Sequence, residues 1–318
     1  LDDGPEHGVP LGGVGAGCIG RAPSGTFNLW HLDGGEHIFE HFPACQFAIH
    51  EKTAEASQTY AMATAGEGLS SWQWYPARET NSDNAATPQG GTYKALYPRS
   101  WYCYGDIFKA ELTCEQFSPI WPDNYKESSY PVVVFVWTAH NPTAQPMTLS
   151  ILLSWQNMVG WFTKAEASPE IQQREGGSPI YDYEPPLRRR AADEQVGGAI
   201  AIKFTLAPGE TKELPFVLSW DLPVTEFAIG KLAHRRYTDF YDRSGRNAWQ
   251  LAQDALANYQ TWRQQIIDWQ QPILERPDLP DWFKMALFNE LYDMASGGTL
   301  WSAASDADPV GQFVILEC

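Results

Sequence analysis

Apolar residues follow two different periods in this 318-residue chain, and the change between them constrains the fold. Before about residue 240 they occur in short runs rich in β-branched and aromatic residues, separated by turn sequences such as NPTAQP and APGE. No run alternates with a helical segment, so the pattern predicts an antiparallel β-sandwich rather than a β-α-β fold. The predicted strands are residues 44–51, 100–105, 106–117, 131–140, 147–156, 198–206 and 214–220.

Two features of this β region lead to further expectations. The strands at 131–140 and 147–156 flank NPTAQP, so we expect them to pair as a hairpin within the sandwich. Two polar stretches, 51–92 and 163–196, contain AATPQGGT and REGGSP and are expected to be surface loops.

The helical period begins after residue 246. Apolar residues recur at steps of three and four over residues 248–270, with Asn247 at the N-cap position and Pro272 expected to end the helix. A second helix is expected to begin near Pro280 and to end before the glycine pair at 297–298. We therefore predict a β domain over residues 1–245, followed over 246–318 by a linker helix and the first part of a helical domain.

Composition excludes several classes of function. A net charge of −17 disfavours binding to nucleic acid or to anionic lipid headgroups, and no apolar stretch is long enough to span a bilayer. The 14 Trp, 14 Tyr and 15 Phe make carbohydrate a candidate ligand, because aromatic rings stack on sugars as well as packing in cores. Five cysteines without a C-x-x-C pair are typical of reduced thiols, so we expect a cytoplasmic protein.

Both ends of the sequence lead us to expect a fragment of a longer protein. The chain begins with Leu1 rather than Met and ends in the apolar run GQFVILEC, with no turn or polar tail after it.

A glycine motif near the N-terminus matches the dinucleotide-binding pattern G-x-G-x-x-G at Gly15, Gly17 and Gly20. That pattern binds a pyrophosphate only where a strand precedes it and a helix follows it. Here the preceding residues are polar and contain prolines, and Pro23 and Gly25 interrupt any helix that would follow. We therefore expect a glycine-rich turn that lets backbone segments pass close together before a strand.

Glu290 is the residue of the second helix that is the main candidate for a catalytic role. At 100° per residue it lies in the middle of one apolar side, and the opposite side is also largely apolar, so we expect protein to enclose the helix. A buried carboxylate is costly unless it is paired, which leaves a structural ion pair and a catalytic role both open. Asp293, one turn onward, is either a second acid or a charge at the helix end. The residues expected around Glu290 are Phe283, Ala286, Leu287 and Met294, with Phe288, Leu291, Ala295 and Lys284 opposite.

The sequence HIFEH, from His37 to His41, matches the H-x-x-E-H pattern of some zinc peptidases. That pattern requires both imidazoles on one face of a helix, whereas two glycines precede this segment and Pro43 follows it. A turn or strand edge with polar residues is the simpler interpretation, and we predict no metal site.

Two segments of the chain resemble glycoside hydrolase family 116, which contains the non-lysosomal glucosylceramidases and microbial β-glucosidases. They are VPLGGVGAGCIGRAPSGTFNLWHL near the N-terminus and LPDWFKMALFNELYDMASGGTLW far downstream, of which FNELY is the most specific part. The likeness extends over essentially the whole chain. It implies an N-terminal β-sandwich followed by the first helices of a catalytic (α/α)6 barrel.

The resemblance also implies a mechanism. Glu290 of FNELY corresponds to the family's catalytic nucleophile, and the acid/base, an Asp in the family, would lie beyond residue 318. Where relatives usually read ELYFLADGG this chain has ELYDMASGG, so Asp293 and Ser296 are departures that affect hydrogen bonding near Glu290.

The leading hypothesis is a retaining β-glycosidase acting on β-glucosides, including glucosylceramide-like ones, without metal or organic cofactor and without nucleic-acid or stable membrane partners. This chain alone, lacking the acid/base, is expected to be inactive. Two alternatives remain open: a non-catalytic carbohydrate-binding β-sandwich protein, and a zinc peptidase that uses His37 and His41.

Overall fold

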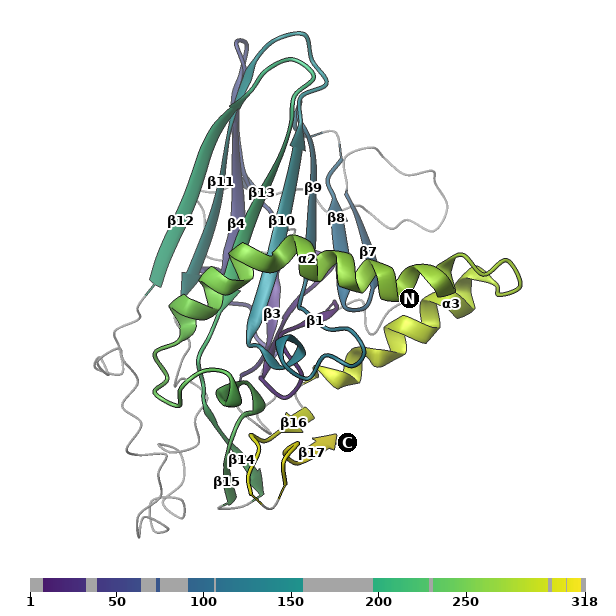
Figure 1. The fold of residues 1–318 in the computed structure, drawn as a ribbon. Coiled ribbons are helices and arrows are strands. Elements are labelled where there is room, and N and C mark those ends of the chain that lie inside the picture. The colour runs from purple at the N-terminus through teal and green to yellow at the C-terminus, as the bar shows by residue number, and fades with distance from the viewer. Residues whose placement is uncertain are drawn as a thin grey trace.

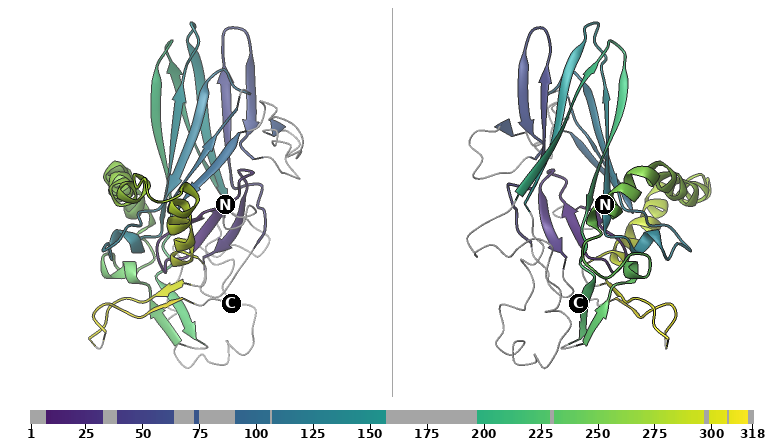
Figure 2. Two further views of the ribbon diagram at one scale, coloured as in Figure 1. Left: turned by 90° about the vertical axis from the view of Figure 1, so that its right-hand side faces the viewer. Right: turned by 60° about the vertical axis from the view of Figure 1, so that its left-hand side comes forward.

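The protein is a two-layered β-sandwich with helices on one side, as seen in a computed structural model (Figures 1 and 2). The structure describes residues 8–32, 39–63, 73–74, 91–105, 107–156, 197–228, 231–296, 299–306 and 308–315. The predicted fold class, a mostly antiparallel β-sandwich followed by helices, is confirmed.

Each layer of the sandwich is a five-stranded sheet. The first has the order β13 (Thr211–Ser219), β10 (Val132–His140), β9 (Glu111–Phe117), β8 (Arg99–Cys103), β7 (Thr92–Leu96). The second has the order β12 (Gly197–Leu206), β11 (Met147–Gln156), β4 (Gln46–Lys52), β5 (Ser57–Ala61), β6 (Gln73–Trp74). Neighbouring strands are antiparallel except β5 and β6, which are parallel.

Three smaller sheets complete the described strands. They are β1 (Pro10–Leu11), β2 (Cys18–Arg21) and β3 (Phe27–His31); the hairpin β14 (Val224–Ala228) and β15 (Lys231–His234); and the hairpin β16 (Thr299–Trp301) and β17 (Phe313–Ile315). Short 3-10 helices lie at η1 (Glu127–Ser129), η3 (Arg236–Asp239) and η4 (Glu290–Met294).

The predicted strands lie where expected, except that one begins later than predicted and one expected loop contains strands. The strand predicted over 106–117 begins only at Glu111, because Phe108 and Ala110 enter the core from a turn whose backbone N–H groups at 109 and 110 bond to the buried Glu51 carboxylate at 3.0 and 2.8 Å. The loop expected over 51–92 contains β5, a largely polar strand that extends the sheet beside β4. The loop expected over 163–196 lies outside the described residues.

The predicted hairpin between 131–140 and 147–156 is wrong. β10 pairs with β9 and β13 in one sheet, whereas β11 pairs with β4 and β12 in the other, so residues 141–146 cross between layers. The buried Asn141 stabilises this crossing. Its side-chain amide donates to the carbonyls of Gln145, Leu206 and Ala207 at 2.8, 3.2 and 3.1 Å, which ties it to the adjacent crossing from β12 to β13.

β10 is covered on both of its faces, which explains its uninterrupted apolar sequence. Val133, Phe135 and Trp137 pack into the core between the two sheets. The alternate residues Val132, Val134 and Val136 pack instead against helix α2 (Ala248–Leu274). Figure 2 shows α2 and α3 (Asp281–Asn289) on one side of the sandwich only.

Helix α2 begins where predicted but continues past Pro272 to Leu274. A proline in the last turn costs only the hydrogen bond to the carbonyl four residues earlier, at Asp268, and that residue is exposed and can be hydrated. Asn247 occupies the N-cap position without capping through its side chain, whose amide donates instead to the Asp221 carboxylate at 3.0 Å.

Arg21, at the end of β2, is fully buried between the sheets. Its Nε donates to the Gly25 carbonyl at 3.1 Å and its Nη2 to the Tyr104 hydroxyl at 3.0 Å, while the guanidinium lies 4.2 Å from the centre of the Tyr102 ring. Aromatic faces and neutral acceptors thus compensate the desolvation of this cation.

Replacing Arg21 with Ala is expected to lower the free energy of unfolding by about 3 kcal/mol, because it leaves a cavity and unpaired polar groups in the core. Arg276, which is exposed and paired with Asp278 on the surface, is the matched control. Arg276→Ala should change stability by less than about 0.5 kcal/mol. Chemical denaturation measures both variants, and equal midpoints would contradict the role given to Arg21.

Candidate functional site

Glu290 lies at the junction between α3 and the 3-10 helix η4. α3 begins after Pro280, as the sequence predicts, with Pro280 in an extended N-cap conformation. The α-helix ends at Asn289, and the chain tightens to a 3-10 helix from Glu290 to Met294. The predicted single helix is therefore two elements, and Glu290 is the first residue of the second.

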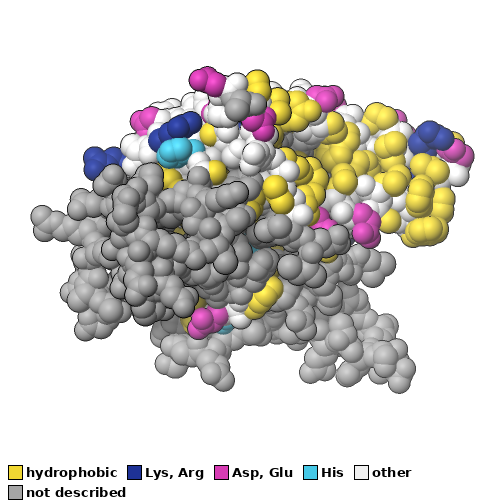
Figure 3. Space-filling model, turned by 90° about the horizontal axis from the view of Figure 1, so that it is seen from below, with side chains coloured by type: hydrophobic (Ala, Val, Ile, Leu, Met, Phe, Trp, Pro, Cys, Tyr) yellow, Lys and Arg dark blue, Asp and Glu magenta, His cyan; other side chains and the backbone are white. Residues whose placement is uncertain are grey.

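The expectation that protein encloses this helix is wrong for the described residues. The buried side chains of α3 are Lys284 and Phe288, and the Phe288 ring packs edge-on against Trp269 of α2 at 5.2 Å between centroids. Glu290 is exposed. Of the apolar residues expected around it, Leu287 is exposed, whereas Phe283, Ala286 and Met294 are half-buried. The exposed large apolar side chains of α3 and η4 are Trp282, Met285, Leu287 and Leu291. Figure 3 shows hydrophobic side chains gathered at one end of the face seen from below.

The physical reason is that α3 is apolar on both sides. The side that carries Phe288 and Lys284, opposite Glu290, packs on α2. The carboxylate of Glu290 consequently projects from an apolar but open surface. A burial cost therefore does not apply to Glu290 in this structure, and neither does the argument that it must be paired.

The two departures from the resembled motif lie in the turn after Glu290. The Ser296 hydroxyl donates to the Asp293 carbonyl at 3.1 Å, and the Thr299 hydroxyl donates to the same carbonyl. Ser296 therefore stabilises the end of η4 by a local hydrogen bond. Asp293 itself is half-buried.

The glycine motif forms a tight turn against the segment that follows η4. Gly15, with φ +69°, leaves no room for a side chain, since a Cβ there would lie 2.5 Å from the Cβ and the backbone N of Trp301 in β16. Gly20 lies within β2, and β3 follows, so no helix begins at the last glycine. The predicted glycine-rich turn is confirmed, and the dinucleotide-binding interpretation loses the structural context that it requires.

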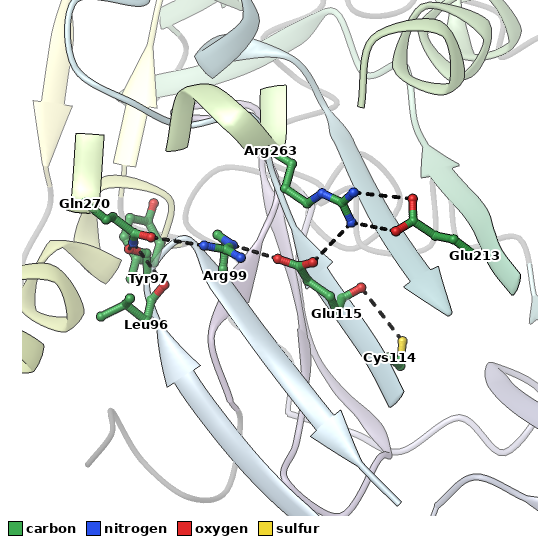
Figure 4. Close-up of polar contacts among 8 residues, drawn as sticks. All are labelled: Leu96, Tyr97, Arg99, Cys114, Glu115, Glu213, Arg263 and Gln270. Carbon is green, nitrogen blue, oxygen red and sulfur yellow. Dashed lines mark hydrogen bonds and ion pairs between the residues drawn. The ribbon is translucent and has the colours of Figure 1, made fainter. Parts of the chain in front are cut away.

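A second set of polar contacts joins α2 to the first sheet (Figure 4). Glu115 of β9 accepts from Arg99 of β8 at 2.6 Å and lies 3.5 Å from Arg263 of α2. Arg263 also donates to Glu213 of β13 at 3.0 Å. Two arginines and two carboxylates therefore alternate along this interface and set the position of the helix on the sheet.

The segment HIFEH, which matches the zinc-peptidase pattern, contains no helix among its described residues. Residues 39–42 are irregular, and His37 lies outside the described residues. Burial lowers the pKa of His41. Within the described ranges, no three His, Cys, Asp or Glu side chains lie close enough together to hold a metal ion.

Four of the five cysteines, Cys18, Cys45, Cys103 and Cys114, are free thiols, and Cys318 lies outside the described residues. Burial raises the pKa of Cys18, Cys45 and Cys114 to about 12. Among the described helices, none has the length and apolar content to cross a membrane.

Comparison with known families identifies the chain. The sequence model described as beta-glucosidase 2, glycosyl-hydrolase family 116 N-term, matches residues 8–189 and 186–262. The chain belongs to glycoside hydrolase family 116. The match to this glycoside hydrolase domain includes the whole sandwich and the first half of α2, and it ends before Glu290.

Sequence reasoning missed the residues that attach α2 and α3 to one turn of the sandwich. Gln270 and Asn289 bond to backbone groups in the turn between β7 and β8, more than 170 positions earlier in the chain. Every residue has a backbone N–H or carbonyl, so the sequence of the turn does not reveal that it binds these two side chains. The one local sign that Asn289 has a role was its position next to Glu290 within FNELY.

Gly15→Ala is expected to destabilise the protein by about 1–3 kcal/mol more than Gly209→Ala. Both glycines have positive φ, +69° and +73°, but a Cβ at Gly209 meets no atom within 4 Å. The difference between the two variants thus isolates the close approach of Trp301. Thermal unfolding measures it, and equal losses of stability would show that the packing against Trp301 is unimportant.

Proposed function

We propose that the full-length protein that carries this chain is a retaining β-glycosidase that hydrolyses β-glucosides, with Glu290 as the nucleophile. The observation that carries the proposal is membership of glycoside hydrolase family 116, joined to the FNELY sequence at residues 288–292. Glu290 is exposed rather than enclosed as the sequence predicted, so the proposal rests on the family and the motif and not on a buried carboxylate.

In the proposed reaction the Glu290 carboxylate attacks the anomeric carbon of the glucoside and forms a glycosyl ester. The bond to the aglycone breaks as a second carboxyl group, about 5–5.5 Å from the first, protonates the leaving oxygen. That second group then removes a proton from water, which attacks the anomeric carbon, releases glucose and regenerates Glu290. Two carboxyl groups supply the whole reaction, so it requires neither a metal nor an organic cofactor.

The domain assignment belongs to the same proposal. In it, residues 1–245 are the β domain, residues 246–318 are a linker helix followed by the start of an (α/α)6 barrel, and the acid/base lies beyond residue 318. The exposed side chains of Trp282, Met285 and Leu291 fit this arrangement, because further helices would cover them. We accordingly infer that this chain alone is inactive.

The proposed substrates are neutral β-glucosides, with glucosylceramide-like glucosides included, and the proposed compartment is the cytoplasm. The net charge of −17 is consistent with a neutral ligand rather than with nucleic acid or an electrostatically held membrane surface.

A 2-fluoro-β-glucoside inactivator is expected to label Glu290 in the full-length protein, because the fluorine slows hydrolysis of the glycosyl ester. Glu290→Gln should lower kcat for an aryl β-glucoside at least about a thousandfold, since an amide is a poor nucleophile. Glu275→Gln, at another exposed glutamate beyond the end of α2, is the control and should retain activity. Peptide mapping and steady-state kinetics provide the measurements.

Labelling at a different residue, with Glu290→Gln still active, would overturn the proposal. Glycan binding by the full-length protein without hydrolysis of any β-glycoside would instead favour the non-catalytic carbohydrate-binding alternative.

A further inference from the structure

The side chain of Asn289, immediately before Glu290, is bonded to the turn between β7 and β8. Its Oδ1 accepts a hydrogen bond from the backbone N–H of Tyr97 at 2.9 Å. Its Nδ2 donates to the carbonyl of Ala95 at 3.4 Å. One amide therefore connects the last residue of α3 to two backbone groups of the β domain.

The same turn is held from α2 by Gln270, which is 1% exposed. Its Nε2 donates to the carbonyl of Tyr97 at 2.9 Å and to that of Leu96 at 3.4 Å, and its Oε1 accepts from Arg99 at 3.4 Å (Figure 4). Because Arg99 is in turn bonded to Glu115, the turn is fixed to both the sheet and α2. The partners of Asn289 are thus parts of a rigid structure rather than of an independent loop.

A second attachment follows Glu290 in the chain. Trp301 packs against Gly15, and the backbone N–H of Ala303 donates to the carbonyl of His234 at 2.7 Å. Between these two attachments, Tyr292 and Met294 of η4 are half-buried against the apolar cluster that contains Tyr97, Ala295 and Trp301. Glu290 lies between this packing and Asn289, and Asn289 is its nearest side-chain hydrogen bond to the β domain.

We propose that Asn289 is a positioning residue for the nucleophile and that the β domain, through the β7–β8 turn, holds Glu290 in register with the substrate. This inference rests on the proposed function of Glu290. Asn289 acts through the backbone and not by contact with the sugar. Without its amide, the Tyr97 N–H loses its partner, and the end of α3 is held to α2 by the packing of Phe288 on Trp269 but no longer to the β7–β8 turn.

A displacement of a reacting group by about 1 Å lowers the rate by as much as a hundredfold. We therefore expect Asn289→Ala to slow glycosylation about 10- to 100-fold per active site, with KM changed much less. The slowing should be equal for dinitrophenyl and for alkyl glucosides, because the acid/base that assists the poorer leaving group is not displaced.

The experiment uses the full-length protein. Titration with 2-fluoro-β-glucoside counts the active sites and gives the rate of glycosylation at each site. Asn258→Ala is the matched control, since Asn258 is exposed on α2 and its amide donates only locally, to the Asp254 carbonyl at 2.8 Å. A purely structural role for Asn289 would reduce the number of sites and leave the rate per site unchanged.

A second pair of variants tests the hydrogen bonds that α2 makes to the same turn. Gln270→Ala should lower the rate per site in the same direction, whereas Gln271→Ala, at the exposed neighbour, should not. This pair provides the test if Asn289→Ala does not yield folded protein.

The outcomes separate the inference from the function on which it rests. Label on Glu290, combined with a wild-type rate per site in the soluble Asn289→Ala or Gln270→Ala variant, overturns the positioning role and leaves the nucleophile assignment intact. Absence of label on Glu290 in the unmodified protein overturns the proposed function itself.

Discussion

The structure depends on the need to cover both faces of β10. Its first six residues, VVVFVW, are all apolar, so both faces of this part of the strand must be removed from water. The second sheet covers the face that carries Phe135 and Trp137, and α2 covers the face that carries Val134 and Val136. A helix placed on the outside of the sandwich is therefore a requirement of the strand beneath it.

The docking of α2 determines where Glu290 can lie. The alternating charges of Arg99, Glu115, Arg263 and Glu213 select one position of the helix on the sheet. α3 then returns along α2, packs on Trp269 through Phe288, and reaches the β7–β8 turn through Asn289. The side of α3 and η4 that carries Glu290 is left open as a consequence.

Much of the fold follows from local sequence patterns. The strands and the beginnings of both helices were predictable, because alternation, β-branching and the proline at position 280 act within a few residues. The pairing of 131–140 with 147–156 was not. A hairpin and a crossing between layers have the same local sequence pattern. The crossing is stabilised by the Asn141 amide, which donates to the carbonyls of Leu206 and Ala207.

The sequence by itself determined that a β region precedes a helical one and that a glycine-rich turn contains Gly15 and Gly17, and its family resemblance makes Glu290 the candidate nucleophile. Only the tertiary structure decided which side of α3 is buried and what holds Asn289. The physical reason is that α3 is apolar on both sides, so its periodicity is compatible with either orientation. Its packing side is selected by partners outside the helix: Trp269 of α2, and Ala95 and Tyr97 of the β domain.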